Sequence, residues 1–331
     1  MTTNIGMHND KSIVIGILAR DCDESLERNI PRVEQLGEYF SNYHVVVFEN
    51  DSKDATKEVL KHWQKRNERV IAIMEDTNTE TIPTDARPAR YRGKSVHRIE
   101  KMAKYRNRVL DYIAVNFDDT DLFCFIDIDI LSFDPKSIVD AIAHAPKDWG
   151  GLFASGIIYY DFANAVHLSP QQYDSYAYVD YGVDPMQMGL WLVSKYFNKV
   201  TRLMMHQDVK KHDYLPCHSA FNGIGIYRWK DIKDVRYGVY QSEEMKSADI
   251  CLCEHVMFNM SLIKRGYKNY IVRDMVAEYQ HEDKKNKTIS PIFQKHPQLR
   301  FFWRYFAKYI CALICRVKKK FYIRPFCKIP I

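Results

Sequence analysis

Apolar and polar residues alternate in blocks along the first part of the chain. Ser12–Leu18, His44–Phe48 and Val70–Met74 are short apolar runs rich in β-branched residues, a pattern typical of buried strands. Apolar residues recur at helical spacing from Leu26 to Phe40, and again after the second run. This β-α-β-α-β order predicts a parallel sheet with right-handed crossovers, and therefore an α/β fold.

The later part of the chain shows the same signals with longer interruptions. The stretch Glu75–His97 is first polar and then basic, lacks periodicity, and is predicted to be a long loop. Asp161–Asp213 mixes aromatic and polar residues, and no element is predicted there. The remaining predicted elements are a helix over Arg98–Asn116, a strand that begins at Leu122, a helix capped by Asp134 and opened by Pro135, strands over Gly151–Tyr160 and Ser219–Tyr227, a helix from Glu254 to about Arg265, and a strand over Asn269–Val272.

The predicted strand that begins at Leu122 ends in two carboxylates, Asp127 and Asp129. Residues i and i+2 of an extended chain point to the same side, so both side chains can face one point at the carboxyl end of the strand. Open α/β sheets bind their ligands at that end. Hard carboxylate oxygens there suit Mg²⁺ or Mn²⁺ carrying phosphates. The alternative is an acidic surface turn, because D-x-D is a common tripeptide.

Composition restricts the class of protein. A chain of 331 residues with 46% hydrophobic and 27% charged residues is typical of a soluble globular protein with one large domain or two smaller ones. The eight cysteines show no C-x-x-C spacing, which favours reduced, buried thiols. The sequence shows no leader-like segment and no apolar run of membrane-spanning length, so we expect a cytoplasmic protein.

The net charge of +6 is unevenly distributed along the chain. Residues 299–331 hold nine basic residues and no acidic one, which leaves a net charge of −3, six minus nine, for residues 1–298. A mildly acidic body argues against binding to nucleic acid. We expect a catalytic domain over 1–298 and an amphipathic basic tail over 299–331. The aromatic residues of the tail and Lys318, Lys319 and Lys320 predict a helix on an anionic membrane surface; the alternative is a helix packed on the body.

Three segments together resemble nucleotide-sugar-dependent glycosyltransferases with the GT-A fold. Glu49–Thr56 resembles the strand-end segment D-D-x-S-x-D-x-T of that group. Asp127-Ile128-Asp129 resembles its metal motif, and Cys253–Tyr267 resembles the E-D-V-D-F…R-x-G-Y segment of the large inverting family.

The chain has a closer resemblance to the fungal capsule-associated α-1,3-mannosyltransferase-like family. The likeness runs roughly from Ile13 to Val272, and it depends on the order and spacing of several weak motifs. The matching stretches are Arg98–Leu110, the D-x-D strand, Tyr159–Asp161, Tyr173–Asp180 and Pro216–Gly223.

The resemblance implies a mostly parallel GT-A sheet with helices on both faces, a nucleotide-sugar donor such as a GDP- or UDP-sugar, and Mn²⁺ or Mg²⁺. The metal ion is expected at Asp127, Asp129 and His281, with Asp129 as the direct ligand. The residues expected to contact the donor are Ala19, Arg20, Glu49, Asp51, Arg106, Asp127, Asn222 and Gly223. The alternatives are a surface salt bridge for Arg20, a tight turn for Asn222-Gly223 and a surface histidine for His281.

The expected chemistry is transfer of a sugar to a glycan or lipid-linked glycan. A divalent ion that bridges the two phosphates would stabilise the departing diphosphate. Glu254 and His255 are the candidate catalytic residues, and they stand where the inverting family has E-D, whose second acid is the general base. The mannosyltransferase-like pattern implies retention instead, so the stereochemical course stays open.

Two other functions remain as alternatives to a glycosyltransferase of surface polysaccharide or lipopolysaccharide synthesis. A sugar nucleotidyltransferase on a similar sheet would need a glycine-rich first strand-to-helix loop, and Leu18–Asp23 has no glycine. A non-catalytic glycan- or membrane-binding protein would not need the intact pair Asp127 and Asp129.

Overall fold

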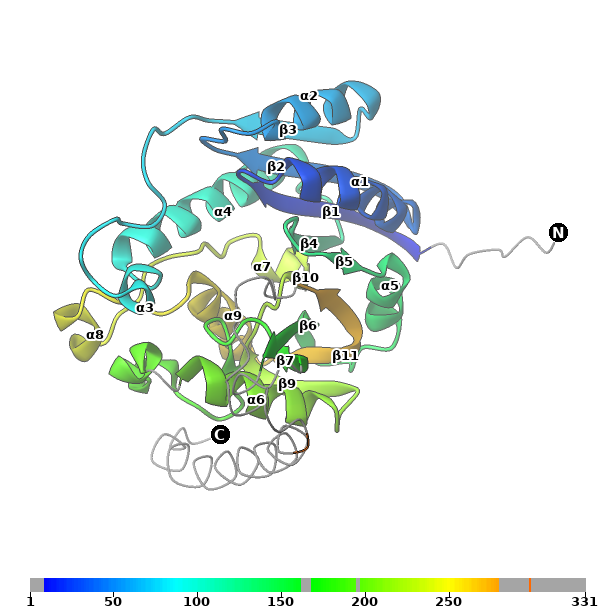
Figure 1. The fold of residues 1–331 in the computed structure, drawn as a ribbon. Helices are drawn as coiled ribbons and strands as arrows, with labels where there is room; N and C mark the ends of the chain where they lie inside the picture. Colours follow the sequence, from blue (N-terminus) through cyan, green and yellow to red (C-terminus); the bar gives the residue numbers. More distant parts are fainter. Residues whose placement is uncertain (1–8, 162–167, 195–196, 280–297, 299–331) are drawn as a thin grey trace.

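A mixed sheet runs through the centre of the molecule, with helices on both faces (Figure 1). The computed structural model describes residues 9–161, 168–194, 197–279 and 298. The strands of the described part are β1 (Asn9–Ala19), β2 (Phe40–Glu49), β3 (Val70–Met74), β4 (Leu122–Asp127), β5 (Ser132–Phe133), β6 (Trp149–Asp161), β7 (Leu168–Gln172), β8 (Val179–Asp180), β9 (Tyr214–Ser219), β10 (Ile224–Arg228) and β11 (Lys268–Glu278). The helices of the same part are α1 (Asp23–Glu38), α2 (Thr56–Arg66), α3 (Ala89–Arg92), α4 (Val96–Asn116), α5 (Pro135–Ala143), η1 (Pro185–Gln187), η2 (Gly189–Val193), α6 (Phe197–Val209), α7 (Trp229–Ile232), α8 (Glu243–Ser247) and α9 (Glu254–Lys264).

The strand order is β3-β2-β1-β4-β10-β6-β11-β9-β8, with β5 paired to β11 and β7 paired to β6. β1 pairs in parallel with both β2 and β4, whereas β10 lies antiparallel between β4 and β6. Following the pairings, β1, β2, β3, β4, β6, β8 and β11 run in one direction. The prediction of an α/β fold with a mostly parallel sheet is therefore confirmed.

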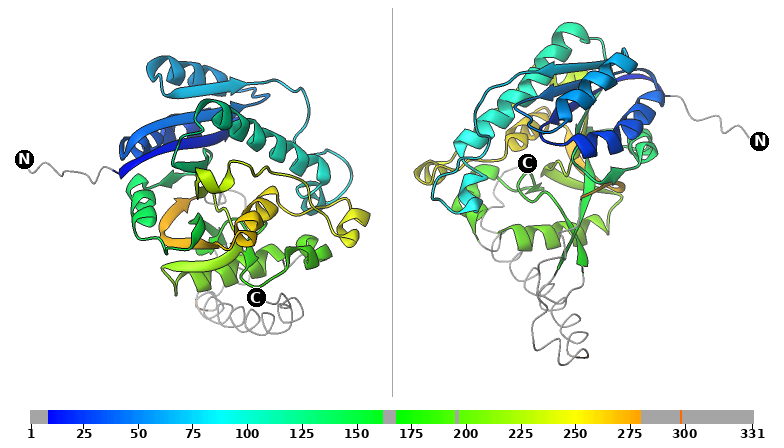
Figure 2. Two further views of the ribbon diagram at one scale, coloured as in Figure 1. Left: turned by 180° about the vertical axis from the view of Figure 1, so that it is seen from behind. Right: turned by 45° about the horizontal axis from the view of Figure 1, so that its top comes forward.

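Alternating side chains of β1 pack into two separate hydrophobic cores, one on each face of the sheet. Ile13, Ile15 and Ile17 pack into the core covered by α1, α2 and α5. Val14 packs into the opposite core, which α4 and α9 cover. Figure 2 shows α4 and α9 in front of the sheet in its left panel. Burial on both faces explains why the strands read as continuous apolar runs in the sequence.

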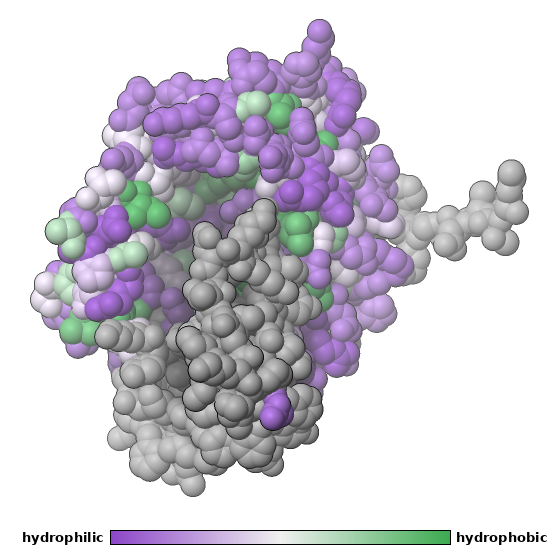
Figure 3. Space-filling model, in the orientation of Figure 1, coloured by the Kyte–Doolittle hydropathy of each residue, from purple (hydrophilic) through white to green (hydrophobic). Residues whose placement is uncertain are grey.

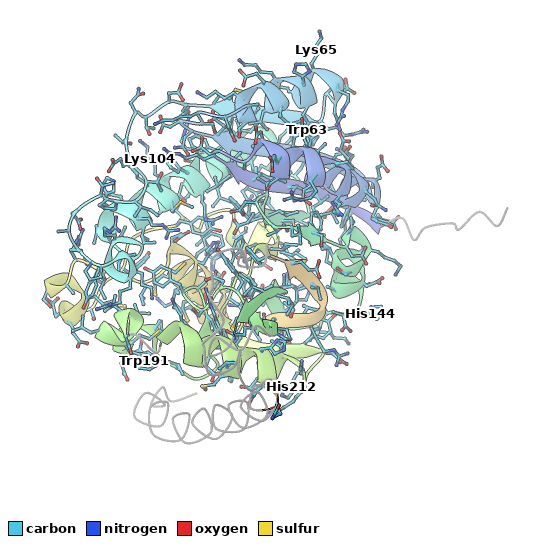
Figure 4. The ribbon with its side chains drawn as sticks, viewed as in Figure 1. Trp63, Lys65, Lys104, His144, Trp191 and His212 are labelled. Carbon is cyan, nitrogen blue, oxygen red and sulfur yellow. The ribbon has the colours of Figure 1, made fainter. Side chains whose placement is uncertain are left out.

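Trp63 joins the two outer helices of the first face. Its side chain is 1% exposed, and its Nε1 donates to Oε1 of Glu34 in α1 over 2.9 Å. Figure 4 shows Trp63 between α2 and α1. The helical spacing read from the sequence for α1 and α2 therefore corresponds to real packing between them.

Several predicted boundaries are wrong, for local reasons. Phe40 was expected in the first helix but begins β2, since the connection between α1 and β2 is very short. The strand expected over Ser219–Tyr227 is divided by a turn at Asn222-Gly223 between β9 and β10, which are not neighbours in the sheet. The loop expected over Glu75–His97 contains α3 and the start of α4, whose Ser95 cap accepts a hydrogen bond from the N–H of Arg98.

The hydrophobic pattern of the sequence failed to predict helices and strands mainly in the second half of the sheet. The stretch Asp161–Asp213, without a predicted element, contributes β7, β8, η1, η2 and α6, all of them short or weakly periodic. β11 extends to Glu278 rather than ending at Val272. Its register shifts between Ile271 and Val276, where the polar pair Arg273-Asp274 interrupts the apolar run.

Polar side chains cover much of the surface visible in Figure 3, whereas the described thiols lie inside the protein. The face in Figure 3 is mainly hydrophilic over α1 and α2, and hydrophobic side chains gather at its hollowed centre. The cysteines of the described part, Cys22, Cys124, Cys217, Cys251 and Cys253, are buried and free. Within residues 9–161, 168–194 and 197–279, no helix combines the length and apolar character needed to cross a membrane.

Candidate active site

The carboxyl ends of β1, β2 and β4 lie side by side. In the strand register Ala19 is opposite Glu49, and Leu18 is opposite Asp127. The sheet grows from β1 through β2 on one side and through β4 on the other. This change of direction is the topological switch point at which open α/β sheets bind ligands. The structure therefore brings Ala19, Glu49 and Asp127 to the edge where a ligand is expected.

Asp127 and Asp129 lie at the end of β4 and just beyond it. Asp127 is the last residue of the strand, and its side chain is 28% exposed. Its backbone N–H donates to the carbonyl oxygen of Gly223 over 2.8 Å. Asp129 lies in the turn that follows and is exposed. The strand thus ends between the two acids, and Asp129 is the more accessible of the pair.

Asp127 lies among other acidic groups. Its pKa is raised to about 8, first by burial and then by the carboxylates of Asp129, Asp174 and Glu254, while Arg106 opposes the rise. Carboxylates this close repel one another, and a bound cation relieves the repulsion. Their hard oxygen atoms fit Mg²⁺ or Mn²⁺.

The described residues around this pair do not by themselves complete a metal site. Within the described residues, no three His, Cys, Asp or Glu side chains are grouped closely enough to hold a metal ion. Mg²⁺ bound to a pair of carboxylates commonly takes water and phosphate as further ligands. His281, the third predicted ligand, lies outside the described residues.

Arg106 is a buried cation between the D-x-D strand and α9. Its side chain is 4% exposed; Nε donates to Oε1 of Glu254 over 3.1 Å, and Nη2 lies 3.7 Å from Oδ1 of Asp127. The guanidinium group lies over the rings of Phe125 and Phe221, 4.5 and 5.0 Å from their centroids. Arg106 was predicted to contact the donor. In the structure its guanidinium group contacts these protein groups and lies between Asp127 and Glu254.

Glu254 and His255 open α9 and are both buried, with side chains 5% and 2% exposed. Burial raises the pKa of Glu254, but its interactions with His255 and with the permanently charged Arg106 lower it below its usual value. The His255 ring stacks on Phe221 at 4.0 Å and meets Tyr237 edge-on at 5.4 Å. Burial lowers the pKa of His255 well below its usual value. At neutral pH, Glu254 is therefore ionised and His255 is neutral.

The two predicted acids at the end of β2 differ in their contacts. Glu49 is fully buried; its Oε1 accepts from the N–H of Ser52 over 2.9 Å, and its Oε2 has no hydrogen-bond partner in the described structure. Asp51 accepts hydrogen bonds from the Thr77 hydroxyl and the N–H of Asn78, at 2.6 and 2.7 Å. Burial raises the pKa of Asp51, but these hydrogen bonds lower it well below its usual value. Asp51 fixes the loop after β3, whereas Glu49 retains one unpaired oxygen.

Arg20 connects the end of β1 to the same loop. Its Nη1 donates to the hydroxyl of Thr81 over 2.7 Å, and its Nε lies 3.6 Å from Oδ2 of Asp21. The side chain of Arg20 is 30% exposed. Ala19, the residue before it, accepts a hydrogen bond from the N–H of Asn50 over 3.4 Å. The loop after β3 thus folds back against the strand ends.

The turn Asn222-Gly223 connects the end of β4 at Asp127 with the segment at Asp174. Both residues have positive φ angles, +54° and +90°. The Asn222 side chain is buried, donates to the carbonyl of Ala154 over 2.9 Å, and accepts from the N–H of Asp174 over 3.2 Å. A Cβ atom on Gly223 would lie 2.4 Å from the hydroxyl of Tyr279, so only glycine fits this position without a shift.

Sequence reasoning missed two residues of this region, Asp174 and Tyr279. Oδ1 of Asp174 accepts from the N–H groups of Tyr176 and Ala177, both at 3.1 Å. The ring of Tyr279 stacks on that of Tyr173, with centroids 3.5 Å apart. Asp174 was visible only as part of a stretch resembling a family, and Tyr279 was missed because β11 was predicted to end too early.

A model of the family described as cryptococcal mannosyltransferase 1 matches residues 12–255, which is well over half of the chain. This chain belongs to that family. The matched range includes the whole switch point, the D-x-D strand and the first two residues of α9. The predicted resemblance to GT-A glycosyltransferases is confirmed, and the family places the protein among enzymes that transfer sugars.

Solved glycosyltransferase structures match this chain at low sequence identity and with TM-scores below 0.5. One is the mannosyltransferase PcManGT from Pyrobaculum calidifontis in complex with GDP-Man and Mn²⁺: it is 10% identical, with 84% of this chain and 59% of that chain covered and a TM-score of 0.44. TarS from S. aureus is 12% identical, with 81% of this chain and 60% of that chain covered and a TM-score of 0.42. GalNAc-T7 with UDP, GalNAc and Mn²⁺ is 12% identical, with 84% of this chain and 45% of that chain covered and a TM-score of 0.45. This chain therefore spans 45% to 60% of the length of these chains. No curated protein has significant sequence similarity to it.

Proposed function

We propose that this protein is a metal-dependent glycosyltransferase that moves a hexose from a nucleotide-sugar donor to a glycan or glycolipid acceptor. The family favours mannose as the hexose and surface polysaccharide or lipopolysaccharide synthesis as the setting. The observation that carries the metal-dependent part is the position of Asp127 and Asp129 at the switch point beside the ends of β1 and β2.

In this proposal Asp127 and Asp129 hold Mn²⁺ or Mg²⁺ together with the donor diphosphate. The bound ion supplies Lewis-acid stabilisation of the negative charge on the leaving diphosphate. Arg106 supports this site, because Nη2 of its buried guanidinium group lies 3.7 Å from Oδ1 of Asp127 and holds that carboxylate in place. Preorganised charges of this kind contribute to catalysis without rearrangement during the reaction.

The nucleotide portion of the donor is proposed to lie over the ends of β1 and β2. Glu49 is the candidate acid for the base, since its Oε2 lacks a partner in the described part of the protein. Arg20 is half-buried beside Ala19 and is the candidate cation for phosphate or base. Asp51 acts indirectly, by fixing the loop that borders this region.

A general-base role for Glu254 or His255 stays a prediction. His255 is neutral at pH 7 and so has a free lone pair, but its ring is enclosed by Phe221 and Tyr237. Glu254 is ionised, but it is paired with Arg106. A retaining transfer needs no such base, and NMR determination of the anomer formed from a hexose donor distinguishes the two routes.

The alternative of a sugar nucleotidyltransferase is not favoured by any observation. The family match is to a mannosyltransferase, and the connection from β1 to α1 has no glycine that would bring backbone N–H groups close to a triphosphate. A non-catalytic binding protein would have no use for the acidic pair at the switch point.

A donor screen tests the proposed function. The full-length protein is incubated with a panel of GDP- and UDP-sugars in the presence of Mn²⁺, and both binding and slow hydrolysis of the donor are measured. We expect one nucleotide to be preferred and its sugar to be released slowly without an acceptor. Absence of binding to every member of the panel would contradict the proposal.

Residues 299–331, which lie outside the described part, are proposed to attach the enzyme to an anionic membrane surface where lipid-linked acceptors are found. The support is the sequence alone, with nine basic residues, no acidic ones and many aromatic residues. A peripheral position on the inner face of a membrane follows from this proposal and is tested with it.

A further inference from the structure

The turn Asn222-Gly223 brings a third acidic residue to the D-x-D strand. The carbonyl of Gly223 accepts from the N–H of Asp127 over 2.8 Å, and the side chain of Asn222 accepts from the N–H of Asp174 over 3.2 Å. Because Asn222 also donates to Ala154, the turn cannot rotate without losing these bonds. Asp127 and Asp174 are therefore held in a fixed relation by one buried turn.

Asp174 has one oxygen committed to the backbone and one available. Oδ1 accepts the N–H groups of Tyr176 and Ala177, each at 3.1 Å, which fixes the side-chain rotamer. Oδ2 accepts no hydrogen bond from the residues that the structure describes. The charge of Asp174 acts on Asp127 and on Tyr279, so its carboxylate lies within electrostatic reach of both.

Tyr279 presents an unpaired hydroxyl group to the same place. Its side chain is 6% exposed, and its hydroxyl has no hydrogen-bond partner among the described residues. The ring is fixed by stacking on Tyr173, and the hydroxyl lies directly against Gly223. The carboxylates of Asp127 and Asp174 both act on it. A buried hydroxyl left without a partner is unfavourable by about 1–3 kcal/mol, so a partner in the bound state gives a reason to keep it.

We propose that Asp174 and Tyr279 form the subsite for the sugar portion of the donor, in which the carboxylate accepts from one hexose hydroxyl and the tyrosine donates to another. The inference rests on the proposed function, because it places the sugar beside the diphosphate held at Asp127. A carboxylate linked to Asn222 and a hydroxyl beside Gly223 supply an acceptor and a donor near one turn, which matches the two-way hydrogen bonding of adjacent sugar hydroxyls. A site built in this way discriminates against sugars that lack the matching hydroxyl, since its polar groups would then stay unpaired.

The test compares binding of a nucleoside diphosphate with binding of the corresponding nucleotide sugar. Calorimetry with Mn²⁺ is carried out on GDP and GDP-mannose and on UDP and UDP-glucose. The variants are Asp174→Asn, which keeps an oxygen for the backbone N–H groups, and Tyr279→Phe, which keeps the ring stack. Matched controls are Asp184→Asn, which has the same type of local bond to the N–H of Met186, and Tyr270→Phe, in β11, the strand that ends just before Tyr279, whose hydroxyl already donates to Asp148.

We expect both variants to weaken binding of the preferred nucleotide sugar about tenfold or more, and to change binding of the bare diphosphate by less than about twofold. The two controls should change neither. Tyr279→Phe should also leave the melting temperature of the free protein equal or higher, because it removes an unpaired buried hydroxyl.

Two results would overturn the inference while leaving the proposed function intact. One is equal weakening of diphosphate and nucleotide sugar, which would indicate a structural role. The other is unchanged binding of the nucleotide sugar in both variants. If the parent protein binds neither diphosphates nor nucleotide sugars, the proposed function and this inference both fail.

Discussion

The Nε atom of Arg106 donates to Oε1 of Glu254 over 3.1 Å, and both side chains are almost completely buried. This ion pair joins α4 to the first residue of α9, and its cation also lies 3.7 Å from Asp127. The pair thus connects the segment resembling the E-D motif to the D-x-D strand.

Breaking this pair should destabilise the fold. Replacing Arg106 by Met leaves the carboxylate of Glu254 buried without its cation, which typically lowers the free energy of unfolding by about 3–5 kcal/mol. Chemical denaturation of Arg106→Met, Glu254→Gln and the double variant measures the coupling between them. The surface pair Lys246 and Glu243 serves as a control, and Lys246→Met should change the free energy of unfolding by about 0.5 kcal/mol or less. A loss below about 1 kcal/mol for Arg106→Met would contradict a coupled buried pair.

Lys94 should make stability depend on alkaline pH. Its ammonium group is buried, donates to the carbonyl of Leu192, and lies 4.9 Å from the centroid of the Tyr176 ring. Burial lowers its pKa from 10.5 to about 7. Between these values the unfolded chain binds the proton and the folded chain does not, so stability rises with pH across this window.

The measurement for Lys94 is the free energy of unfolding of the parent and of Lys94→Met from pH 7 to 10. The parent should gain stability relative to the variant as the pH rises, and Lys246→Met, at an exposed site, should follow the parent. Parallel curves for the parent and Lys94→Met would show that the folded protein does not depress this pKa.

Gly223 should tolerate alanine less well than a glycine of similar backbone conformation. Gly182 has a φ angle of +80°, and a Cβ atom added there would have nothing within 4 Å, whereas at Gly223 the Cβ would lie 2.4 Å from the Tyr279 hydroxyl. Gly182→Ala should therefore show only the backbone strain, about 1–2 kcal/mol. Gly223→Ala should add about 1–3 kcal/mol for overpacking, and it should also weaken donor binding through Asp127. Equal losses of unfolding free energy in the two variants would argue against the close contact.

The basic tail should direct the full-length protein to anionic vesicles. Reversing the charge of Lys318, Lys319 and Lys320 to Glu removes about 1 kcal/mol of attraction per lysine, and the new charges are repelled. Sedimentation with vesicles of phosphatidylcholine and phosphatidylserine should recover the parent in the pellet and leave the variant in the supernatant. Both proteins should stay in solution with phosphatidylcholine alone. Equal recovery of parent and variant would contradict an electrostatic attachment.

The first half of the fold was predictable because its signals are local. Strands β1, β2 and β3 read as apolar runs, α1 and α2 between them follow from the predicted helices, and α4 follows β3. β4 was also predicted, and with it the acids at its end. β1, β2 and β3 are neighbours both in the chain and in the sheet, so the pattern of each segment predicts its role in the fold.

The second half of the site was not predictable because it depends on contacts between distant segments. Asp174 is linked to the D-x-D strand through the side chain of Asn222, and Tyr279 follows β11, whose register shifts midway. Arg106 was identified as a site residue, but sequence gave no indication that its partners would be Glu254 and Asp127. Such relations arise from tertiary packing and leave no periodic pattern.

The central claim is that Asp127 and Asp129 hold a divalent ion together with the donor diphosphate. Its most direct test is Mn²⁺ binding followed by electron paramagnetic resonance, with and without GDP or UDP, for the parent and for Asp129→Asn. The parent should bind Mn²⁺ tightly only when the preferred diphosphate is present, because an ion held by Asp127 and Asp129 would take further ligands from the phosphate oxygens. Asp129→Asn should lose this diphosphate-dependent binding while keeping the melting temperature of the free protein. Mn²⁺ binding that is equal in parent and variant, or that is unaffected by either diphosphate, would contradict the claim.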